Sequence, residues 1–293
     1  MKTSAAKRGQ PSPDTSSVIG EGRDLDVLAS IAWAGLLSTS QIERLHFPSR
    51  RRAQRRLRAL LDHGLVRAHV QGEALQRENV YTATPLGIDR LVEGGFFASG
   101  APTPARAPRA QHLPHALAIR DVFVAVVLAE RTGQFQIESL QFESELRGEP
   151  VLAAAHLEPD MLLSLARAEA VGLVGVEVDR GTETTTTLRA KFEAWRRVLS
   201  TTGSRRGFER ATLLVTAPRE TRAVTLRRLL GEAGLAERAR VVLLAEVATL
   251  CADGWPFPRI APPGRTEPPH EGAATFTALS VEDEGFTPIQ APR

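Results

Sequence analysis

The sequence predicts an α/β protein of the α+β kind, in which a small helical domain precedes a larger domain with a mixed sheet. Three observations lead to this prediction. An arginine-rich segment with helical spacing is followed by two short apolar runs, and a linker rich in proline and alanine comes next. Apolar runs of strand length then alternate with amphipathic helices. A chain of 293 residues has room for both domains and for tails.

The first domain is expected over residues 22–97. Apolar residues recur at helical spacing over 24–37, 41–45, 50–63 and 85–92. Gly64 is placed to end the third of these helices. Short apolar pairs at 65–66 and 80–81, around Gly72, predict a two-stranded wing. This order of elements resembles a winged helix-turn-helix.

The third helix carries the predicted DNA contacts. Six of the nine residues from 50 to 58 are arginine, and three of them share a face at spacings of four and three residues. Such a helix suits the major groove, where arginine binds guanine edges or phosphates, so we expect double-stranded DNA as a partner. A solvated basic face is the alternative. The predicted DNA-binding residues are Arg50, Arg51, Arg52, Arg55, Arg56 and Arg58.

The second domain is expected over residues 113–254, after a linker at 98–112. Its first helix runs through Leu117 to Leu128. Strands are predicted over 135–146, 156–165, 171–178, 208–215 and 241–244, with helices over 186–199 and 220–231. The order is therefore α-β-β-β-α-β-α-β, and the third strand is apolar enough to be buried on both faces.

Lys191 is the most informative residue of this domain. It is the only lysine outside the first seven residues, although the chain has 37 basic residues. On its predicted helix it shares a face with the apolar residues Trp195 and Leu199, so its ammonium points toward the sheet. An unpaired buried ammonium is costly, and Glu177 or Asp179 is the nearest carboxylate by topology.

The second domain resembles the PD-(D/E)XK nuclease superfamily, whose core is α-β-β-β-α-β. Over residues 24–250 the chain also resembles the replication-relaxation family of plasmid and mobile-element proteins, which join a winged helix to a region of the form H…PD…ExDxGT…K. The matching positions are His115, Pro159-Asp160, Glu177-Val178-Asp179-Arg180-Gly181-Thr182 and Lys191. The resemblance implies a nuclease-like, α/β sandwich and a role in replication or DNA relaxation.

The predicted catalytic residues are Asp160, Glu177, Asp179 and Lys191. Carboxylates at the ends of adjacent strands suit a hard cation, so Asp160 and Glu177 are the expected ligands of Mg²⁺ or Mn²⁺. The superfamily pattern places lysine where this chain has Asp179. Either Asp179 is a third metal ligand and Lys191 supplies the ammonium, or the cluster is a buried ion pair that joins helix to sheet.

Two main functions follow from these residues. One is a DNA-binding protein of plasmid or mobile-element replication, with a metal-dependent nuclease or nickase centre. The other is a non-catalytic winged-helix regulator whose α/β domain mediates homodimerisation or partner binding. A protein-binding adaptor without DNA contact is a third, weaker alternative. The basic segment favours a polyanionic partner over the adaptor.

The remaining features of the sequence concern its two terminal segments and the expected cellular location of the protein. Residues 1–21 and the proline-rich, acidic residues 255–293 have few large apolar side chains, and the first of these is expected to be disordered. The polar start lacks an apolar signal segment, and no apolar run reaches the ~20 residues of a membrane span. With a single cysteine, Cys251, the chain is expected in the cytoplasm, without a membrane partner.

Overall fold

The computed structural model describes residues 22–71, 78–96, 109–168, 170–201, 207–208 and 211–256. The chain divides into two compact units, residues 1–120 with 292–293 and residues 121–291, and the division falls within helix α5 (Leu113–Arg131). The predicted disordered start, Gly72 of the wing, linker residues 98–108 and nearly all of the tail lie outside the described residues.

The first unit has the predicted order of elements with one addition, the two-residue strand β1. Its sheet is antiparallel with the order β1-β3-β2. The elements are α1 (Arg23–Ala34), β1 (Leu37–Ser38), α2 (Thr39–His46), α3 (Arg50–Asp62), β2 (Val66–Gln71), β3 (Glu78–Ala83) and α4 (Pro85–Glu93), followed by the start of α5. That this unit works as a winged helix-turn-helix stays a prediction.

Local chemistry sets the helix boundaries of the first unit. Ser38 and Gln41 form a reciprocal cap at the start of α2, in which each side chain accepts a backbone N–H of the other residue. At the end of α3, Gly64 adopts a φ of 71°, and the N–H of Leu65 reaches the carbonyl of Leu60. This Schellman turn sends the chain into β2, as the position of Gly64 predicted.

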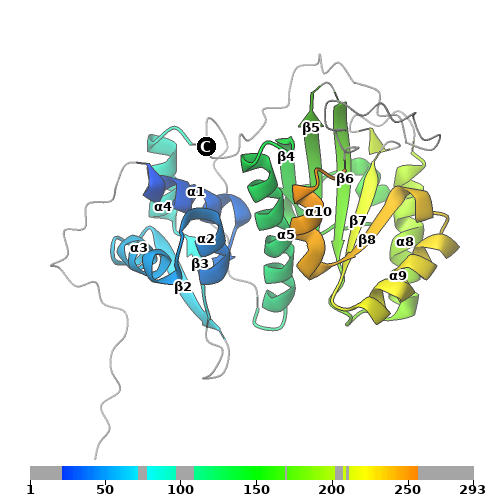
Figure 1. The fold of residues 1–293 in the computed structure, drawn as a ribbon, viewed down its shortest axis with the longest axis horizontal. Helices are drawn as coiled ribbons and strands as arrows, with labels where there is room; N and C mark the ends of the chain where they lie inside the picture. The colour runs from blue at the N-terminus through cyan, green and yellow to red at the C-terminus, as the bar shows by residue number, and fades with distance from the viewer. Residues whose placement is uncertain are drawn as a thin grey trace, which may run out of the picture. The chain divides into compact units, whose positions relative to one another are not determined.

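The second unit is a five-stranded mixed sheet between helices (Figure 1). Strands β4, β5 and β6 pair antiparallel, and β6, β7 and β8 pair parallel. Beyond α5, its elements are β4 (Gln136–Phe142), α6 (Glu143–Leu146), α7 (Pro150–Ala154), β5 (Met161–Arg167), β6 (Ala170–Val178), α8 (Thr185–Leu199), β7 (Thr212–Ala217), α9 (Glu220–Glu232), β8 (Ala239–Leu243) and α10 (Val247–Ala252). The predicted order of the long elements is confirmed.

The structure corrects three predicted strands. The strand expected over 135–146 ends at Phe142, because the Glu145 carboxylate accepts the N–H of Phe142 at 2.9 Å and starts α6. The strand expected from residue 156 begins only at Met161. Pro150 starts the unpredicted helix α7 before it. The strand expected over 208–215 lies at 212–217.

Two helices cover one face of the sheet and fix the setting of the site. Figure 1 shows α8 and α9 on this face, with α5 and α10 on the other. The core between the sheet and the helices α8 and α9 contains Phe192 and Trp195 of α8, Leu226 of α9, and Leu213 and Val215 of β7. In the part of the chain that is described, no helix has the length and apolar character to cross a membrane.

Candidate functional site

Glu177, the last residue but one of β6, is the buried centre of the site. Its side chain is 4% exposed, and both carboxylate oxygens accept hydrogen bonds. Trp195 donates its indole N–H to Oε1 at 2.8 Å, and Lys191 donates from Nζ to Oε2 at 3.0 Å. Because both donors come from α8, this carboxylate joins the helix to the sheet with charge-assisted hydrogen bonds.

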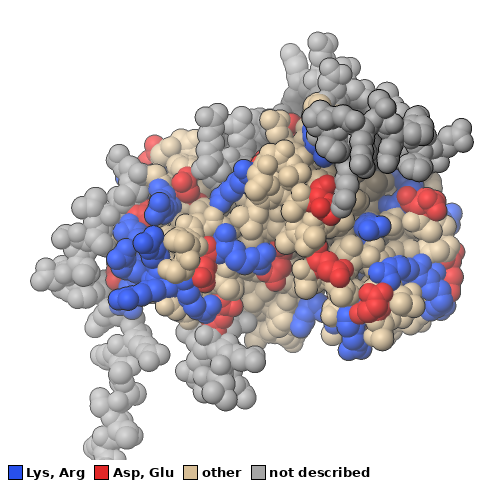
Figure 2. All heavy atoms as spheres, in the orientation of Figure 1, with Lys and Arg blue, Asp and Glu red and all other residues tan. Residues whose placement is uncertain are grey.

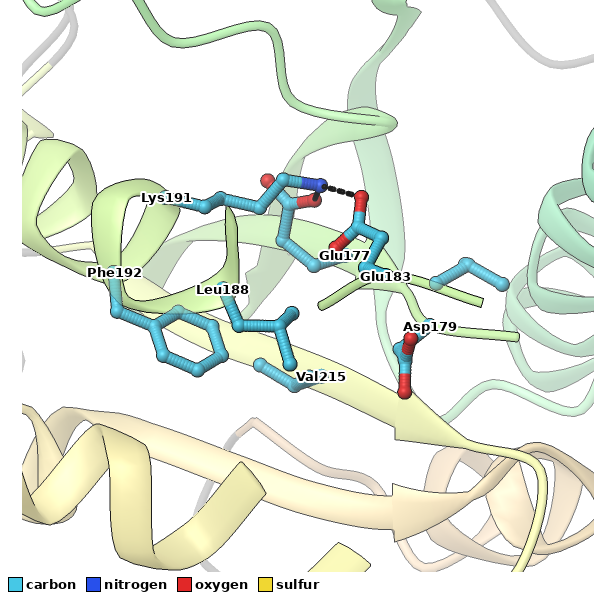
Figure 3. Close-up of a pocket in the computed structure, with 8 residues that line it drawn as sticks. Glu177, Asp179, Glu183, Leu188, Lys191, Phe192 and Val215 are labelled. Carbon is cyan, nitrogen blue, oxygen red and sulfur yellow. Dashed lines mark hydrogen bonds and ion pairs between the residues drawn. The ribbon is translucent and has the colours of Figure 1, made fainter. Parts of the chain in front are cut away.

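Lys191 lies between two carboxylates, as Figure 3 shows. Beyond its bond to Glu177, its Nζ donates to Oε1 of Glu183 at 3.2 Å. The inward direction and the Glu177 partner agree with the expectation from helical spacing. Glu183 was not predicted, since it lies in the loop between β6 and α8, whose path no sequence pattern specified.

Asp160, the residue just before β5, lies opposite Glu177 of β6. The antiparallel register pairs Met161 of β5 with Val176 of β6. One step further along this register, Asp160 faces Glu177. Asp160 is 6% exposed, and its Oδ2 accepts the N–H of Val178 at 2.6 Å. The predicted meeting of Asp160, Glu177 and Lys191 is therefore present in the structure.

Asp179 is turned to a different partner. Its two oxygens accept from Nε and Nη2 of Arg222, on α9, at 2.5 and 3.0 Å. Its Oδ1 also accepts the N–H of Gly181 at 3.0 Å. In Figure 3 the Asp179 carboxylate lies apart from the Lys191 ammonium. The structure thus does not bring Asp179 to Lys191, and it adds Arg222, which the sequence analysis missed.

Burial and charge shift the pKa values of the central pair. Burial, with a smaller contribution from the Asp160 charge, raises the pKa of Glu177 to about 7, although the Lys191 ammonium opposes the shift. Burial alone would lower the pKa of Lys191, but Glu177, Asp160 and Glu183 together raise it. The raised pKa means that the Glu177 carboxylate takes up a proton more readily than an exposed glutamate does.

The carboxylates of the site meet only part of what a magnesium ion requires. Mg²⁺ is usually held by one or two carboxylates and retains several water molecules, and Asp160 with Glu177 supplies two such carboxylates. Among the described residues, however, no group of three or more His, Cys, Asp or Glu is arranged to hold a metal ion. Asp160 and Glu177 are the residues that would hold the ion.

The arginines of α3 fall into two groups. Arg56 turns inward, where its Nε donates to Oδ1 of the buried Asp24 at 2.8 Å and its Nη2 contacts Oδ2. This pair joins α3 to α1, so Arg56 has a structural partner within the first unit, and its role as a DNA contact stays a prediction. The other predicted arginines are exposed, and Figure 2 shows basic side chains gathered over α3.

Three of those exposed arginines have no ion pair in the described part of the chain. Arg50 lies 3.8 Å from Glu78, and Arg58 pairs with Asp62 one turn later at 2.9 Å. Arg51, Arg52 and Arg55 are the exposed arginines of this helix for which the described residues provide no acidic partner. His115, a member of the predicted motif, lies half-buried in the part of α5 that belongs to the first unit.

Comparison with known proteins identifies the family. The family model described as Replication-relaxation matches residues 28–210. The chain belongs to the replication-relaxation family. Among curated proteins, none matches the chain significantly. A solved structure of the restriction endonuclease FokI is similar with a TM-score of 0.32 and 11% identity, over 82% of this chain and 45% of that one. The chain thus spans less than half of the FokI chain, and so distant a likeness supports no argument about function.

Proposed function

We propose that this replication-relaxation protein binds double-stranded DNA through α3 and that Asp160, Glu177 and Lys191 form a metal-dependent nuclease or nickase centre. The observation that carries the proposal is the placement of the Lys191 ammonium against Glu177, with Asp160 directly before the facing strand β5. The two acids and the amine come from three separate places in the chain: Glu177 from β6, Lys191 from α8, and Asp160 from just before β5.

The chemistry of such a centre needs few groups. A bound Mg²⁺ or Mn²⁺ would lower the pKa of a water molecule and offset charge on a phosphate. Asp160 and Glu177 would hold the ion, and Trp195 fixes the Glu177 carboxylate through its indole N–H. Lys191 would donate to a phosphoryl oxygen or to the attacking water, which is work that a compact ammonium does well.

Metal-dependent nicking of supercoiled DNA tests this centre. With Mg²⁺ or Mn²⁺ the purified protein is expected to convert supercoiled plasmid to open circles. Asp160→Asn is expected to lower the rate by at least about a hundredfold, as the loss of one charge-stabilising group does elsewhere, while DNA affinity is retained. Glu193→Gln is the matched control, because Glu193 is an exposed acid of α8 whose partner is Arg196. Intact supercoiled, linear and single-stranded DNA after incubation with either metal would contradict the catalytic proposal.

The DNA-binding part of the proposal has a separate test. Replacing Arg51, Arg52 and Arg55 together by Ala is expected to weaken duplex binding and to reduce the slope of log K against log salt by about 2–3, since each phosphate contact contributes about 0.9. Fluorescence anisotropy with a labelled duplex at several salt concentrations measures both. The control removes the same charge from the second unit by replacing its exposed arginines Arg189, Arg227 and Arg228. Equal losses in the two variants would remove α3 as the binding surface.

A non-catalytic regulator is the second candidate function. It is favoured by the bonds of Asp179 to Arg222, which make this acid a structural residue, and by the donors that already engage both oxygens of Glu177. In this case the second unit would serve dimerisation or partner binding while α3 still binds DNA. Retained DNA affinity without cleavage under any metal condition is the result that this function predicts.

A further inference from the structure

The two carboxylates that bind Lys191 differ in how they are held. Glu177 is 4% exposed, lies within a central strand and has a second donor in Trp195. Glu183 is 32% exposed, and within the described part of the chain Lys191 is the partner of its carboxylate. The side chain of Lys191 is 23% exposed. Lys191 therefore has one fixed inner partner and one outer partner that solvent reaches.

The cavity beside these residues is too small for a ligand larger than water. Glu177, Glu183 and Lys191 line it together with Asp179, Leu188 and Phe192, and its volume is about 10 Å³. That is close to the minimum space that one water molecule needs. A phosphate group has several times that size, so it enters this cavity beside Lys191 only if a lining residue moves.

Glu183 is the lining residue that moves most easily. Its neighbours Glu177 and Lys191 lie in β6 and α8, and Asp179 is held by Arg222. The backbone of Glu183 is fixed, because Arg222 donates from Nη2 to its carbonyl at 2.8 Å. Its side chain, however, needs only a rotation about its own bonds to leave the ammonium. Access to Lys191 thus requires no movement of the loop.

We propose that the Glu183 carboxylate occupies the place of a phosphoryl oxygen on the Lys191 ammonium, and that a phosphate group of nucleic acid binds Lys191 by displacing it. The inference rests on the proposed function, which supplies the nucleic acid. Glu183 then excludes small anions from the centre until a ligand with further contacts competes with it. An ion pair as exposed as this one is weak enough for such an exchange.

The labelling rate of Lys191 by an amine-acetylating reagent tests the proposal in the full chain, with a chelator present. The chain has three lysines, so peptide mass spectrometry assigns the label at Lys191 without ambiguity. Glu183→Gln is expected to speed the labelling about fivefold, which equals about 1 kcal/mol at 25 °C. Glu193→Gln, on the same helix as Lys191, is the matched control and leaves the rate unchanged. The same rate in Glu183→Gln and the wild type would overturn the proposal, and Glu183→Ala repeats the test with a shorter side chain.

Added anions complete the experiment. Inorganic phosphate and, separately, a short DNA duplex are expected to slow Lys191 labelling more strongly in Glu183→Gln than in the wild type. Equal protection of both proteins would overturn the exchange of carboxylate for phosphate. Protection of the variant by inorganic phosphate without protection by the duplex would count against nucleic acid as the ligand. None of these measurements depends on DNA cleavage. If the centre proved to be catalytically inactive, the role of Glu183 could therefore still be tested.

Discussion

Replacing Lys191 by Met is expected to lower the free energy of unfolding by about 3 kcal/mol at pH 8, because it leaves the buried Glu177 charge without its ammonium. The loss is expected to shrink at pH 5. The folded-state pKa of Glu177, about 7, lies above its ordinary value of 4.5. Stability from this acid is therefore fully present below pH 4.5 and is lost as the pH rises through 7. Without the ammonium this pKa rises further, so the variant loses more stability above pH 7 than the wild type does.

Urea denaturation at pH 5 and pH 8, in the presence of a chelator, measures this effect. Lys191→Met with Glu177→Gln is the matched double variant, in which a neutral amide still accepts from Trp195. It is expected to be more stable at pH 8 than Lys191→Met alone, since no buried charge remains unpaired. A destabilisation of Lys191→Met that is equal at both pH values, and that the second substitution does not relieve, would show that Glu177 does not carry the effect.

Lys191→Arg separates charge from shape at the same position. The guanidinium is wider than an ammonium, and a cavity of about 10 Å³ beside Leu188 and Phe192 has no room for it. The retained charge therefore does not restore the wild-type stability in this variant. A loss of stability in this variant, measured by urea denaturation, would show that space rather than charge favours lysine over arginine at position 191.

The sequence predicted the parts of the site that depend on local periodicity. Helical spacing placed Lys191 with Trp195 on the buried face of α8, and the apolar run of β6 placed Glu177 near a strand end. These two elements are consecutive long elements of the chain, so their contact followed from the element order. The same spacing carried a signal that was missed in α3, where Arg56 lies three residues after Ala53 and four before Leu60, both buried.

Contacts across a long separation were beyond sequence reasoning. Arg222 follows Asp179 by 43 residues, and it reaches this acid because β7 returns beside β6 before α9 begins. Any of the many arginines after β6 could have paired with Asp179 on chemical grounds alone. Glu183 carried no signal either, since its side chain depends on the path of the loop before α8. The sequence pattern alone therefore could not predict the ion-pair partners that tertiary packing brings to Asp179 and Lys191.

Gly175→Ala is expected to destabilise the second unit by about 3 kcal/mol or more. A Cβ at this position of β6 would lie 2.2 Å from Cη2 of Trp195 and under 3.0 Å from two more atoms of the same ring. The ring cannot retreat, because Trp195 is fully buried and its N–H is bonded to Glu177. Overpacking of a close-packed core costs about 1–3 kcal/mol even where side chains can adjust. The clash also moves the donor that orients Glu177, so the proposed nicking activity is expected to fall with stability.

Thermal denaturation followed by tryptophan fluorescence measures the loss, which corresponds to about 6–12 °C for a unit of this size. Gly231→Ala is the control, because this glycine lies in α9 and a Cβ there meets nothing within 4 Å. It is expected to leave stability unchanged or raise it by up to about 1 kcal/mol. Adding Trp195→Phe to Gly175→Ala shortens the ring and removes the contact, so the double variant should regain part of the stability. If Gly175→Ala melted like the wild type, Trp195 would not press on β6, and the alignment of Glu177 by its indole would lose its structural basis.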